Sequence, residues 1–275
     1  MATDYPSNWL YVPHELYGHE IGMASLIRLF VEPDLKAGAE VALTRDQQHY
    51  LANVMRRREG DVIAVFNGRD GEWRASIANI FKRAGLLLIE ENRKAQASEP
   101  DLWLVFALLK RGPVDLIAEK AAELGVSRLC PVCTERTNTA RLKMDRLRAI
   151  ATEAAEQCGR LTLPKIDDPQ SLETLLSAWP SDRGLVWLDE TGSGAPIADV
   201  MVARKKGSPD ALLIGPEGGF SPTELRLIGK KSYVTPTSMG KRLLRAETAC
   251  IAALSTWQAL AGDWQSDRPA GLDVI

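Results

Sequence analysis

The spacing of apolar and polar residues divides the chain into two parts with different secondary structure. Between about residues 26 and 91, short β-compatible runs alternate with turns rich in glycine. We predict four strands there, at residues 26–31, 62–67, 73–80 and 86–90. A single helical pattern at residues 44–55 interrupts them. This arrangement favours a small β-barrel.

Strands and helices alternate from residue 101 onward. Apolar runs predict buried strands at residues 102–109, 128–132, 184–188, 211–214 and 233–235. Helical spacing predicts helices at residues 114–124, 145–158, 198–203, 222–229 and 246–260. Strands that are buried on both faces and separated by helices indicate a mainly parallel sheet, so we predict the α/β fold class for this part.

The two patterns also predict the domain organisation. The polar stretch that ends at Pro100 contains no large apolar side chain, which is typical of a linker. We predict an N-terminal extension at residues 1–24, a barrel domain at 25–92, a linker at 93–100, an α/β domain at 101–263 and a C-terminal tail at 264–275.

Composition and charge exclude several classes of protein. The chain has 275 residues and is 45% hydrophobic, so it is not a disordered protein. Its formal net charge is −2, so its surface is not positively charged as a whole. A nucleic-acid surface must then be a local patch. The longest apolar run, residues 102–109, is far shorter than the roughly 20 residues of a membrane helix. We expect a cytoplasmic protein with no membrane partner.

The cysteines and histidines do not predict a metal site. Cys130 and Cys133 have the spacing of a zinc or redox pair, but a structural zinc needs two further ligands. The chain has only three histidines and no second cysteine pair. We expect all four cysteines to be small core residues.

A glycine-rich loop follows the predicted strand 211–214. Residues 215–219 (GPEGG) lead into residues 221–224 (SPTE), a capping box with proline at the first helical position. Open α/β sheets bind ligands at such a strand end, where glycines let a flat ligand approach the backbone. A tight turn alone would explain one or two of the glycines. The following residues exclude a phosphate-binding loop, so the pattern indicates a nucleotide-like ligand of open identity.

A second polar loop precedes the predicted helix 246–260. It contains the cations Lys241, Arg242 and Arg245, followed by Glu247. An acid suits a helix start, but arginines there oppose the helix dipole and suggest an external anionic partner.

Together, the segments IGPEGGFSPTE and MGKRLLRAETA resemble the signature of the RsmE family of small-subunit ribosomal RNA methyltransferases, in the SPOUT superfamily. Residues 119–126 (EKAAELGV), 156–160 (EQCGR) and 49–56 (HYLANVMR) fit the same family. The resemblance covers about residues 26–260, whereas residues 1–24 match nothing in it.

The resemblance implies a fold and a ligand. The fold is a PUA-like β-barrel followed by a SPOUT methyltransferase domain whose C-terminal part is a trefoil knot, a rare exception to unknotted topology. The protein would be a homodimer that binds S-adenosylmethionine, with no metal, in the knot and beside the subunit interface. The implied cofactor-binding residues are Leu188, Gly215, Glu217, Gly218, Gly219, Met239, Arg242, Leu243, Leu244 and Arg245.

The implied reaction is methylation of N3 of one uridine in 16S ribosomal RNA. Because N3 carries a proton and is weakly nucleophilic, the proton must leave and the reacting atoms must be aligned. Arg245 is the expected stabiliser of negative charge on the uracil oxygens. Glu217 or Glu247 could accept the proton, although either could equally be a structural cap.

The predicted RNA-binding residues are Arg28, Arg56, Arg57, Arg58, Arg136 and Arg160. A solvated helix end is the alternative for residues 56–58, and salt bridges are the alternative for Arg136 and Arg160. The partner would be 16S rRNA or the small ribosomal subunit. Two other functions stay open: methylation of another atom, such as a ribose 2′-hydroxyl, and RNA binding in ribosome assembly without catalysis.

The predicted helix 246–260 is apolar almost all round, so it needs cover on more than one side. The sheet of the same chain can cover one side, and the same helix of a second copy can cover another. On this basis Ala253→Arg should weaken both dimerisation and cofactor binding.

Overall fold

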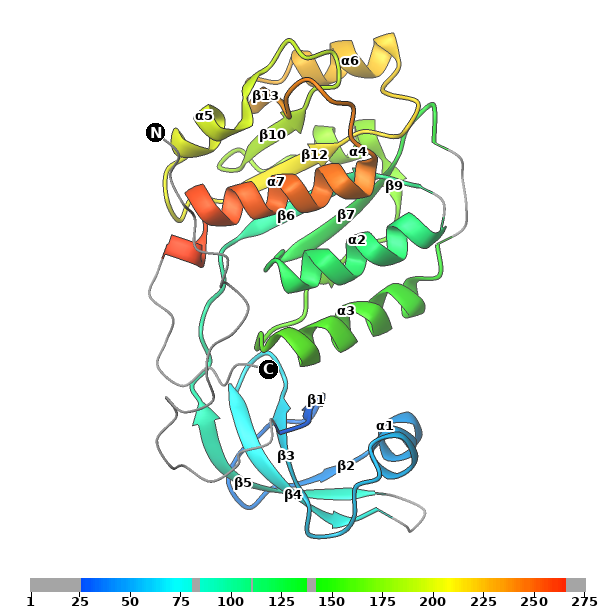
Figure 1. The fold of residues 1–275 in the computed structure, drawn as a ribbon, viewed down its shortest axis with the longest axis vertical. Coiled ribbons are helices and arrows are strands. Elements are labelled where there is room, and N and C mark those ends of the chain that lie inside the picture. Colours follow the sequence, from blue (N-terminus) through cyan, green and yellow to red (C-terminus); the bar gives the residue numbers. More distant parts are fainter. Residues whose placement is uncertain (1–25, 81–84, 110, 138–141, 266–275) are drawn as a thin grey trace, which may run out of the picture.

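The computed structural model describes residues 26–80, 85–109, 111–137 and 142–265. Within these ranges the chain forms two sheets, one of five strands and one of eight (Figure 1). The five-stranded sheet lies in the N-terminal half, and the eight-stranded sheet follows it along the chain.

The N-terminal sheet is curled and mainly antiparallel. Its strands, in the spatial order β1-β3-β4-β5-β2, are β1 (Arg28–Phe30), β3 (Val62–Phe66), β4 (Glu72–Asn79), β5 (Leu86–Lys94) and β2 (Glu40–Ala42). Register shifts between β4 and β5 increase the curl. Strand β5 is longer than predicted and enters the expected linker, because Arg93 and Lys94 both pair with the fully buried Glu72.

One helical segment covers the N-terminal sheet. Thr44 caps α1 (Arg45–His49), and its hydroxyl accepts a hydrogen bond from the backbone N–H of Gln47. The helix continues as a π-helical turn, Tyr50–Val54, whose Leu51 is completely buried in the core of the barrel. The helix predicted at residues 44–55 is therefore present, with a wider last turn.

The second sheet is entirely parallel. Its path runs β11-β13-β10-β12-β6-β7-β8, and β9 also pairs with β7. The strands are β6 (Leu102–Ala107), β7 (Arg128–Cys133), β8 (Lys165–Ile166), β9 (Gln170–Ser171), β10 (Gly184–Leu188), β11 (Ala195–Pro196), β12 (Asp210–Ile214) and β13 (Val234–Ser238).

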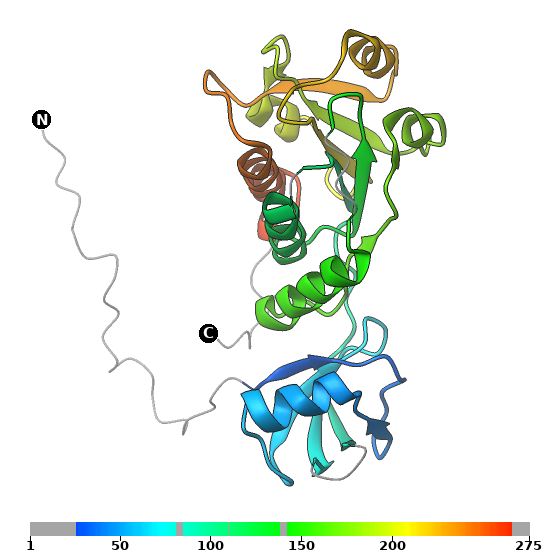
Figure 2. The ribbon, with the colours of Figure 1, turned by 90° about the vertical axis from the view of Figure 1, so that its right-hand side faces the viewer.

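Helices cover both faces of this sheet (Figure 2). One layer contains α2 (Arg111–Glu123), α3 (Met144–Cys158), α5 (Ile197–Val202) and α7 (Ala246–Leu260). The other contains α4 (Leu172–Ser177) and α6 (Pro222–Gly229), and a short 3-10 turn, Asp263–Gln265, follows α7.

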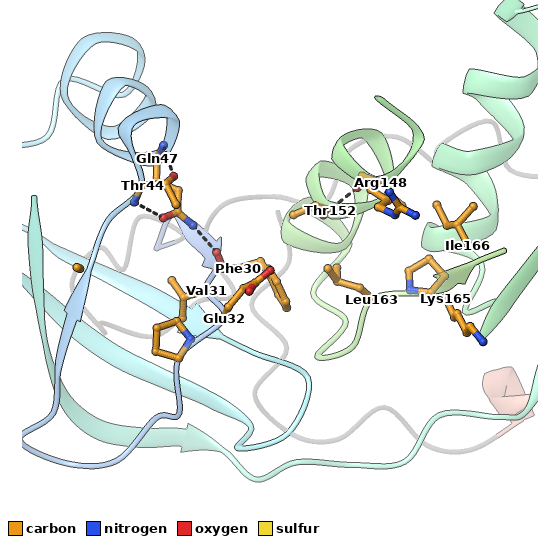
Figure 3. A pocket seen from close by; sticks show the side chains of 14 residues that line it. Phe30, Val31, Glu32, Thr44, Gln47, Arg148, Thr152, Leu163, Lys165 and Ile166 are labelled. Carbon is orange, nitrogen blue, oxygen red and sulfur yellow. Dashed lines mark hydrogen bonds between the residues drawn. The ribbon is translucent and has the colours of Figure 1, made fainter. Parts of the chain in front are cut away.

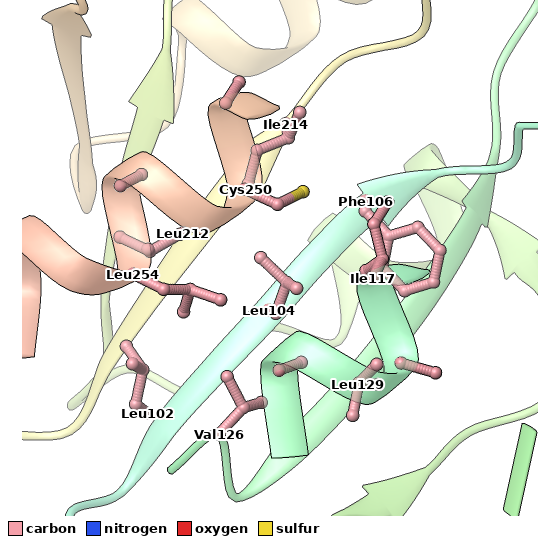
Figure 4. Packing of buried hydrophobic residues seen from close by; sticks show 14 of the residues in the cluster. Leu102, Leu104, Phe106, Ile117, Val126, Leu129, Leu212, Ile214, Cys250 and Leu254 are labelled. Carbon is pink, nitrogen blue, oxygen red and sulfur yellow. The ribbon is translucent and has the colours of Figure 1, made fainter. Parts of the chain in front are cut away.

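Alternation along the central strand β6 builds the two cores. Leu102, Leu104 and Phe106 face the layer with α2 and α7, as Figure 4 shows, whereas Val105 faces the layer with α4 and α6. Side chains of a strand alternate between its two faces, so one continuous apolar run supplies both cores.

The chain is threaded at one end of this sheet. Strand β13 lies between β10 and β11, although β11 follows β10 directly in sequence. Residues 189–194 must therefore cross the carboxyl end of β13. Asp189 donates its N–H to the carbonyl oxygen of Thr237, and a Cβ on Gly194 would lie 2.5 Å from the Thr237 nitrogen. Only glycine permits so close a crossing.

The cysteines are only partly in the core. Cys130 and Cys250 are buried, Cys133 is half-buried and Cys158 is exposed, which corrects the expectation for the last two. Burial raises the pKa of the Cys130 thiol to about 12 and also raises that of Cys250.

The described residues contain neither a candidate metal site nor a candidate membrane span. No group of three or more His, Cys, Asp or Glu side chains in these ranges is placed to hold a metal ion. None of the helices in the same ranges combines the length and apolar character needed to cross a membrane.

Candidate cofactor and RNA site

Three loops meet at one edge of the parallel sheet. Strands β10, β12 and β13 end at Leu188, Ile214 and Ser238, and the register pairs Leu188 with Thr237. Carboxyl ends of parallel strands share an edge, so the segments that follow them lie together. These segments are residues 189–194, 215–221 and 239–245.

The glycine-rich loop is held in a fixed turn. The N–H of Gly219 donates to the carbonyl oxygen of Pro216 at 2.8 Å, and Gly219 has a φ of +70°. A Cβ on Gly219 would meet the carboxylate of Glu190, and one on Gly215 would lie 2.8 Å from the Phe220 ring. The chain's own packing therefore requires these two glycines.

Gly218 is different from its neighbours. It is exposed, and a Cβ there would come only within 3.6 Å of the Arg136 side chain, which is ordinary contact. The backbone at Gly218 is the part of the loop that is open to a ligand. Arg136 fixes this part from the side, because its Nη1 donates to the Gly218 carbonyl oxygen at 2.8 Å.

Two carboxylates that the sequence did not single out hold the loops in place. Asp189 accepts hydrogen bonds from the N–H and hydroxyl of Thr191 and from the hydroxyl of Ser193. Burial acts to raise the pKa of Asp189, but these bonds outweigh it and keep the pKa below its usual value. Glu190 accepts from the N–H of Phe220 at 3.2 Å and so joins the first loop to the second.

Glu224 also holds two segments together. Its two oxygens accept from the N–H groups of Glu135 and Ser221, so the capping box of α6 also fixes the segment after β7. The sequence predicted the capping box, but it contained no signal for the bond to Glu135, 89 positions away.

The third loop combines buried and exposed side chains. Met239 and Leu244 pack against the core on the α7 side of the sheet, whereas Arg242, Leu243 and Arg245 are exposed. Leu243 is 87% exposed, which is unusual for a large apolar side chain. Arg245 is the N-cap of α7, and its side chain makes no capping hydrogen bond.

The two predicted proton acceptors differ in their surroundings. Glu217 is exposed on the glycine-rich loop. Glu247 lies in the first turn of α7, and its Oε2 is buried without a hydrogen-bond partner. A buried carboxylate oxygen is costly unless a donor satisfies it. Oε2 of Glu247 is therefore an unsatisfied acceptor that a hydrogen-bond donor at this site could satisfy.

Two of the predicted RNA-binding arginines are buried at the junction of the two halves. Arg28 donates to the carbonyl oxygens of Ala155, Glu156 and Arg160 at 2.6–2.9 Å and pairs with Glu72. Its side chain is 12% exposed. The expectation of an RNA contact for Arg28 is corrected, because its guanidinium is already used within the chain.

Arg160 is corrected for the same reason. Its side chain is 7% exposed and pairs with Glu99. It also donates to the carbonyl oxygens of Ala122 and Val126, between α2 and β7. The salt-bridge alternative therefore holds for Arg160.

The arginine run after the π-helical turn is mostly on the surface. Arg56 and Arg58 are exposed, and Arg57 is half-buried. Arg56 has a φ of +52°, a left-handed conformation that a non-glycine residue rarely adopts. The turn thus holds Arg56 in an unusual backbone conformation.

Comparison with known proteins identifies both halves. Residues 97–258 match a family described as an RNA methyltransferase domain, and residues 43–90 match an RNA methyltransferase PUA domain. A relative from Synechocystis, named ribosomal RNA small subunit methyltransferase E, is 33% identical over 85% of this chain and 77% of its own length.

Two solved structures share the fold. A Legionella pneumophila structure, described as a methyltransferase in complex with the bound cofactor SAM, has a TM-score of 0.78 and 31% identity, covering 86% of this chain and 99% of its own. The ribosomal RNA small subunit methyltransferase E of Neisseria gonorrhoeae, bound to S-adenosyl methionine, has a TM-score of 0.78 and 25% identity, with coverage of 87% and 100%. These likenesses confirm the predicted SPOUT fold with a PUA-like barrel. The chain belongs to the ribosomal RNA small subunit methyltransferase E family.

Proposed function

We propose that this protein transfers the methyl group of S-adenosylmethionine to N3 of a uridine in 16S ribosomal RNA, in the cytoplasm. The observation that carries the proposal is the meeting of the glycine-rich loop and the loop before α7 at one edge of a threaded parallel sheet, in a chain of this family. S-adenosylmethionine supplies an electrophilic methyl group on a sulfonium. No metal takes part in this proposal.

The residues at the three loops fit such a cofactor. The exposed backbone at Gly218 can donate to and accept from an adenine without a charged side chain. The half-buried Met239 and Leu244, with Leu188 in the same core cluster, offer apolar contact. The unpartnered Oε2 of Glu247 suits a cationic or N–H group. We assign the ten residues implied by the family signature to the cofactor on these grounds.

Arg245 and Glu247 are the residues that we assign to the reaction. Arg245 is fixed at its backbone by the N-cap position, while its guanidinium faces solvent, where a uracil can reach it. It stabilises negative charge on the uracil oxygens. Glu247 accepts the N3 proton in preference to Glu217, because it lies in the first turn of α7, two residues after Arg245.

RNA binding is assigned to Arg56, Arg57, Arg58 and Arg136. Arg56, Arg58 and Arg136 are exposed and Arg57 is half-buried, whereas the guanidinium groups of Arg28 and Arg160 bind carboxylates and carbonyl oxygens of the chain itself. Phosphate contacts are sensitive to salt, and each contributes about 0.7 to the salt slope for single-stranded RNA. Replacing residues 56–58 by alanine should flatten the salt dependence of RNA binding and leave cofactor affinity unchanged.

The protein acts as a homodimer in this proposal. Helix α7 buries Ala253 completely within its own chain, so Ala253→Arg would disrupt the core and cannot serve as the interface test expected from the sequence. Ile251 and Ala252 are only half-buried, and they leave an apolar strip for a second copy. Ala252→Arg should weaken the dimer while the single chain stays folded, as sedimentation can show.

Mass-spectrometric mapping of the product tests the proposed function. The purified protein is incubated with labelled S-adenosylmethionine and either free 16S rRNA or small ribosomal subunits lacking the modification. One methyl group on a uridine base at N3 is expected. A methyl group on a ribose 2′-hydroxyl would overturn the target atom, and RNA binding without methyl transfer would favour an assembly factor.

A further inference from the structure

A cavity lies between the barrel and α3 (Figure 3), at the opposite end of the molecule from β13 and α6 (Figure 1). Its volume is about 780 Å³, within the range of small-ligand sites. The barrel wall comes from the end of β1 and from Thr44 and Gln47 at the start of α1. The opposite wall comes from Arg148 and Thr152 on α3 and from residues 163–166.

The walls of this groove combine apolar and polar side chains, and the uncharged polar side chains Thr44, Gln47 and Thr152 are already paired. Gln47 donates from Nε2 to the Phe30 carbonyl oxygen and accepts from the N–H of Thr44. The hydroxyl of Thr152 donates to the Arg148 carbonyl oxygen. The groove therefore offers apolar surface from Phe30 and Leu163, with few groups to read the hydrogen-bonding edge of a base.

Two cations line the α3 side. Arg148 pairs with Asp145 at 3.1 Å, but both side chains are exposed, so the pair is weak and readily exchanged. Lys165 lies 3.5 Å from Asp167, whose carboxylate also binds Arg128 at 2.7 Å. One carboxylate thus serves two cations, so the α3 wall carries one positive charge in excess, whereas the exposed Glu32 places a carboxylate on the opposite, barrel wall.

The groove has a fixed width. Arg28 of β1 donates to carbonyl oxygens at the end of α3, and the N–H of Phe30 donates to the Glu156 carboxylate at 2.8 Å. The two walls are therefore tied together at their base, beside the cavity. A preformed site binds without the cost of closing two domains.

We propose that this groove holds an unpaired nucleotide of the RNA substrate, outside the methyl-transfer site. The inference rests on the proposed function and adds a second contact on the same RNA. The base lies against the apolar walls, and its phosphate lies at Arg148 and Lys165. Because the polar groups of the walls are paired internally, binding depends little on the identity of the base.

Two variants that leave the fold intact can test whether the groove binds RNA. Ala42 is exposed on β2 and lines the groove, so Ala42→Trp fills it from the barrel side without disturbing the core. The double variant Arg148→Glu, Lys165→Glu reverses the charge of the other wall. Lys230→Glu, at the exposed end of α6, is the matched control for a change of charge far from the groove.

Affinity for 16S rRNA at several salt concentrations is the measurement, with S-adenosylmethionine affinity measured in parallel. We expect each groove variant to lose at least about tenfold in RNA affinity, and the double variant to lose about 0.7 from the salt slope for the one phosphate that it contacts. Cofactor affinity and the Lys230→Glu control should stay as in the unchanged protein.

Failure of this inference can be told apart from failure of the proposed function. If the unchanged protein methylates rRNA and the groove variants bind RNA equally well, the groove is not an RNA site and the proposed function stands. If Ala42→Trp instead abolishes dimerisation with RNA affinity intact, the groove belongs to a second copy, and the inference is overturned. If the unchanged protein neither binds nor methylates rRNA, both fail.

Discussion

Arg136 donates a hydrogen bond from Nη1 to the carbonyl oxygen of Gly218, at 2.8 Å, across 82 positions of sequence. The bond joins the segment after β7 to the one glycine of the loop that its own chain leaves open. In the proposed function, this arginine fixes the backbone of the cofactor-binding loop and also binds RNA, so the two kinds of binding would meet at one side chain.

Arg136→Ala should therefore weaken cofactor binding as well as RNA binding. A hydrogen bond from a charged donor contributes roughly 1.5–3 kcal/mol, so S-adenosylmethionine affinity should fall at least about tenfold. Calorimetry measures this, with Arg226→Ala on α6 as an exposed control. An unchanged affinity would show that the loop keeps its shape without Arg136.

Gly218→Val and Gly219→Ala should separate ligand contact from folding. The free chain has room at Gly218, so the valine variant should fold normally and lose S-adenosylmethionine affinity. Gly219 has a positive φ and the Glu190 carboxylate against it, so even alanine should lower the unfolding temperature. Thermal unfolding with and without cofactor distinguishes the two, and full cofactor affinity in Gly218→Val would remove this loop from the site.

Arg245→Lys should lower kcat by about 10²-fold or more. Lysine keeps the charge but not the planar fork that holds two acceptors, and the loss of one fixed donor to a developing anion has about this effect. Single-turnover methylation measures the rate at saturating RNA and cofactor. A change confined to KM would mean that Arg245 binds RNA and takes no part in the methyl transfer.

Arg28→Met should destabilise the protein by roughly 3 kcal/mol, since it removes a partner of the fully buried Glu72 and three donors to the end of α3. Urea unfolding measures the change. Arg74→Met, on the same sheet, removes a partly exposed pair with Glu90 and should cost less than about 1 kcal/mol. Equal losses of stability in the two variants would contradict the conclusion that Arg28 ties the barrel to the end of α3.

The buried cysteines should be protected from alkylation. Burial raises the pKa of Cys130 to about 12, so at pH 8 its thiol stays protonated in the folded chain. An unfolded thiol has a pKa of about 8.5. The contribution of Cys130 to stability is therefore complete below pH 8.5 and is lost as the pH rises toward 12. Mass spectrometry after alkylation, with and without urea, should show Cys130 and Cys250 modified only when urea is present.

Much of the fold could be predicted from the apolar pattern, because buried strands and long helices impose a period on the sequence. The bounds of β10, α6 and α7 agree with the prediction to the residue. Helix α4, the three-residue strand β2 and the two-residue strands β8, β9 and β11 were missed, since elements so short complete too few periods to be recognised.

The site was harder to predict than the fold. Glycines 215, 218 and 219 look alike in sequence, yet only tertiary packing shows that two of them serve the chain itself. Arg28 and Arg58 are likewise the same residue type, and only the first finds carbonyl acceptors about 130 positions away. No local pattern encodes such partners.

The crossing of residues 189–194 over β13 also constrains how the protein is made. These residues are synthesised before β13 and α7. The C-terminal part of the chain must therefore pass through the crossing after β10 and residues 189–194 have been made. An unfolded C-terminus is narrow enough to pass through, but a stably folded domain fused after α7 would have to pass through with it. A reporter or purification partner therefore belongs at the amino end, where synthesis begins and nothing needs to be threaded.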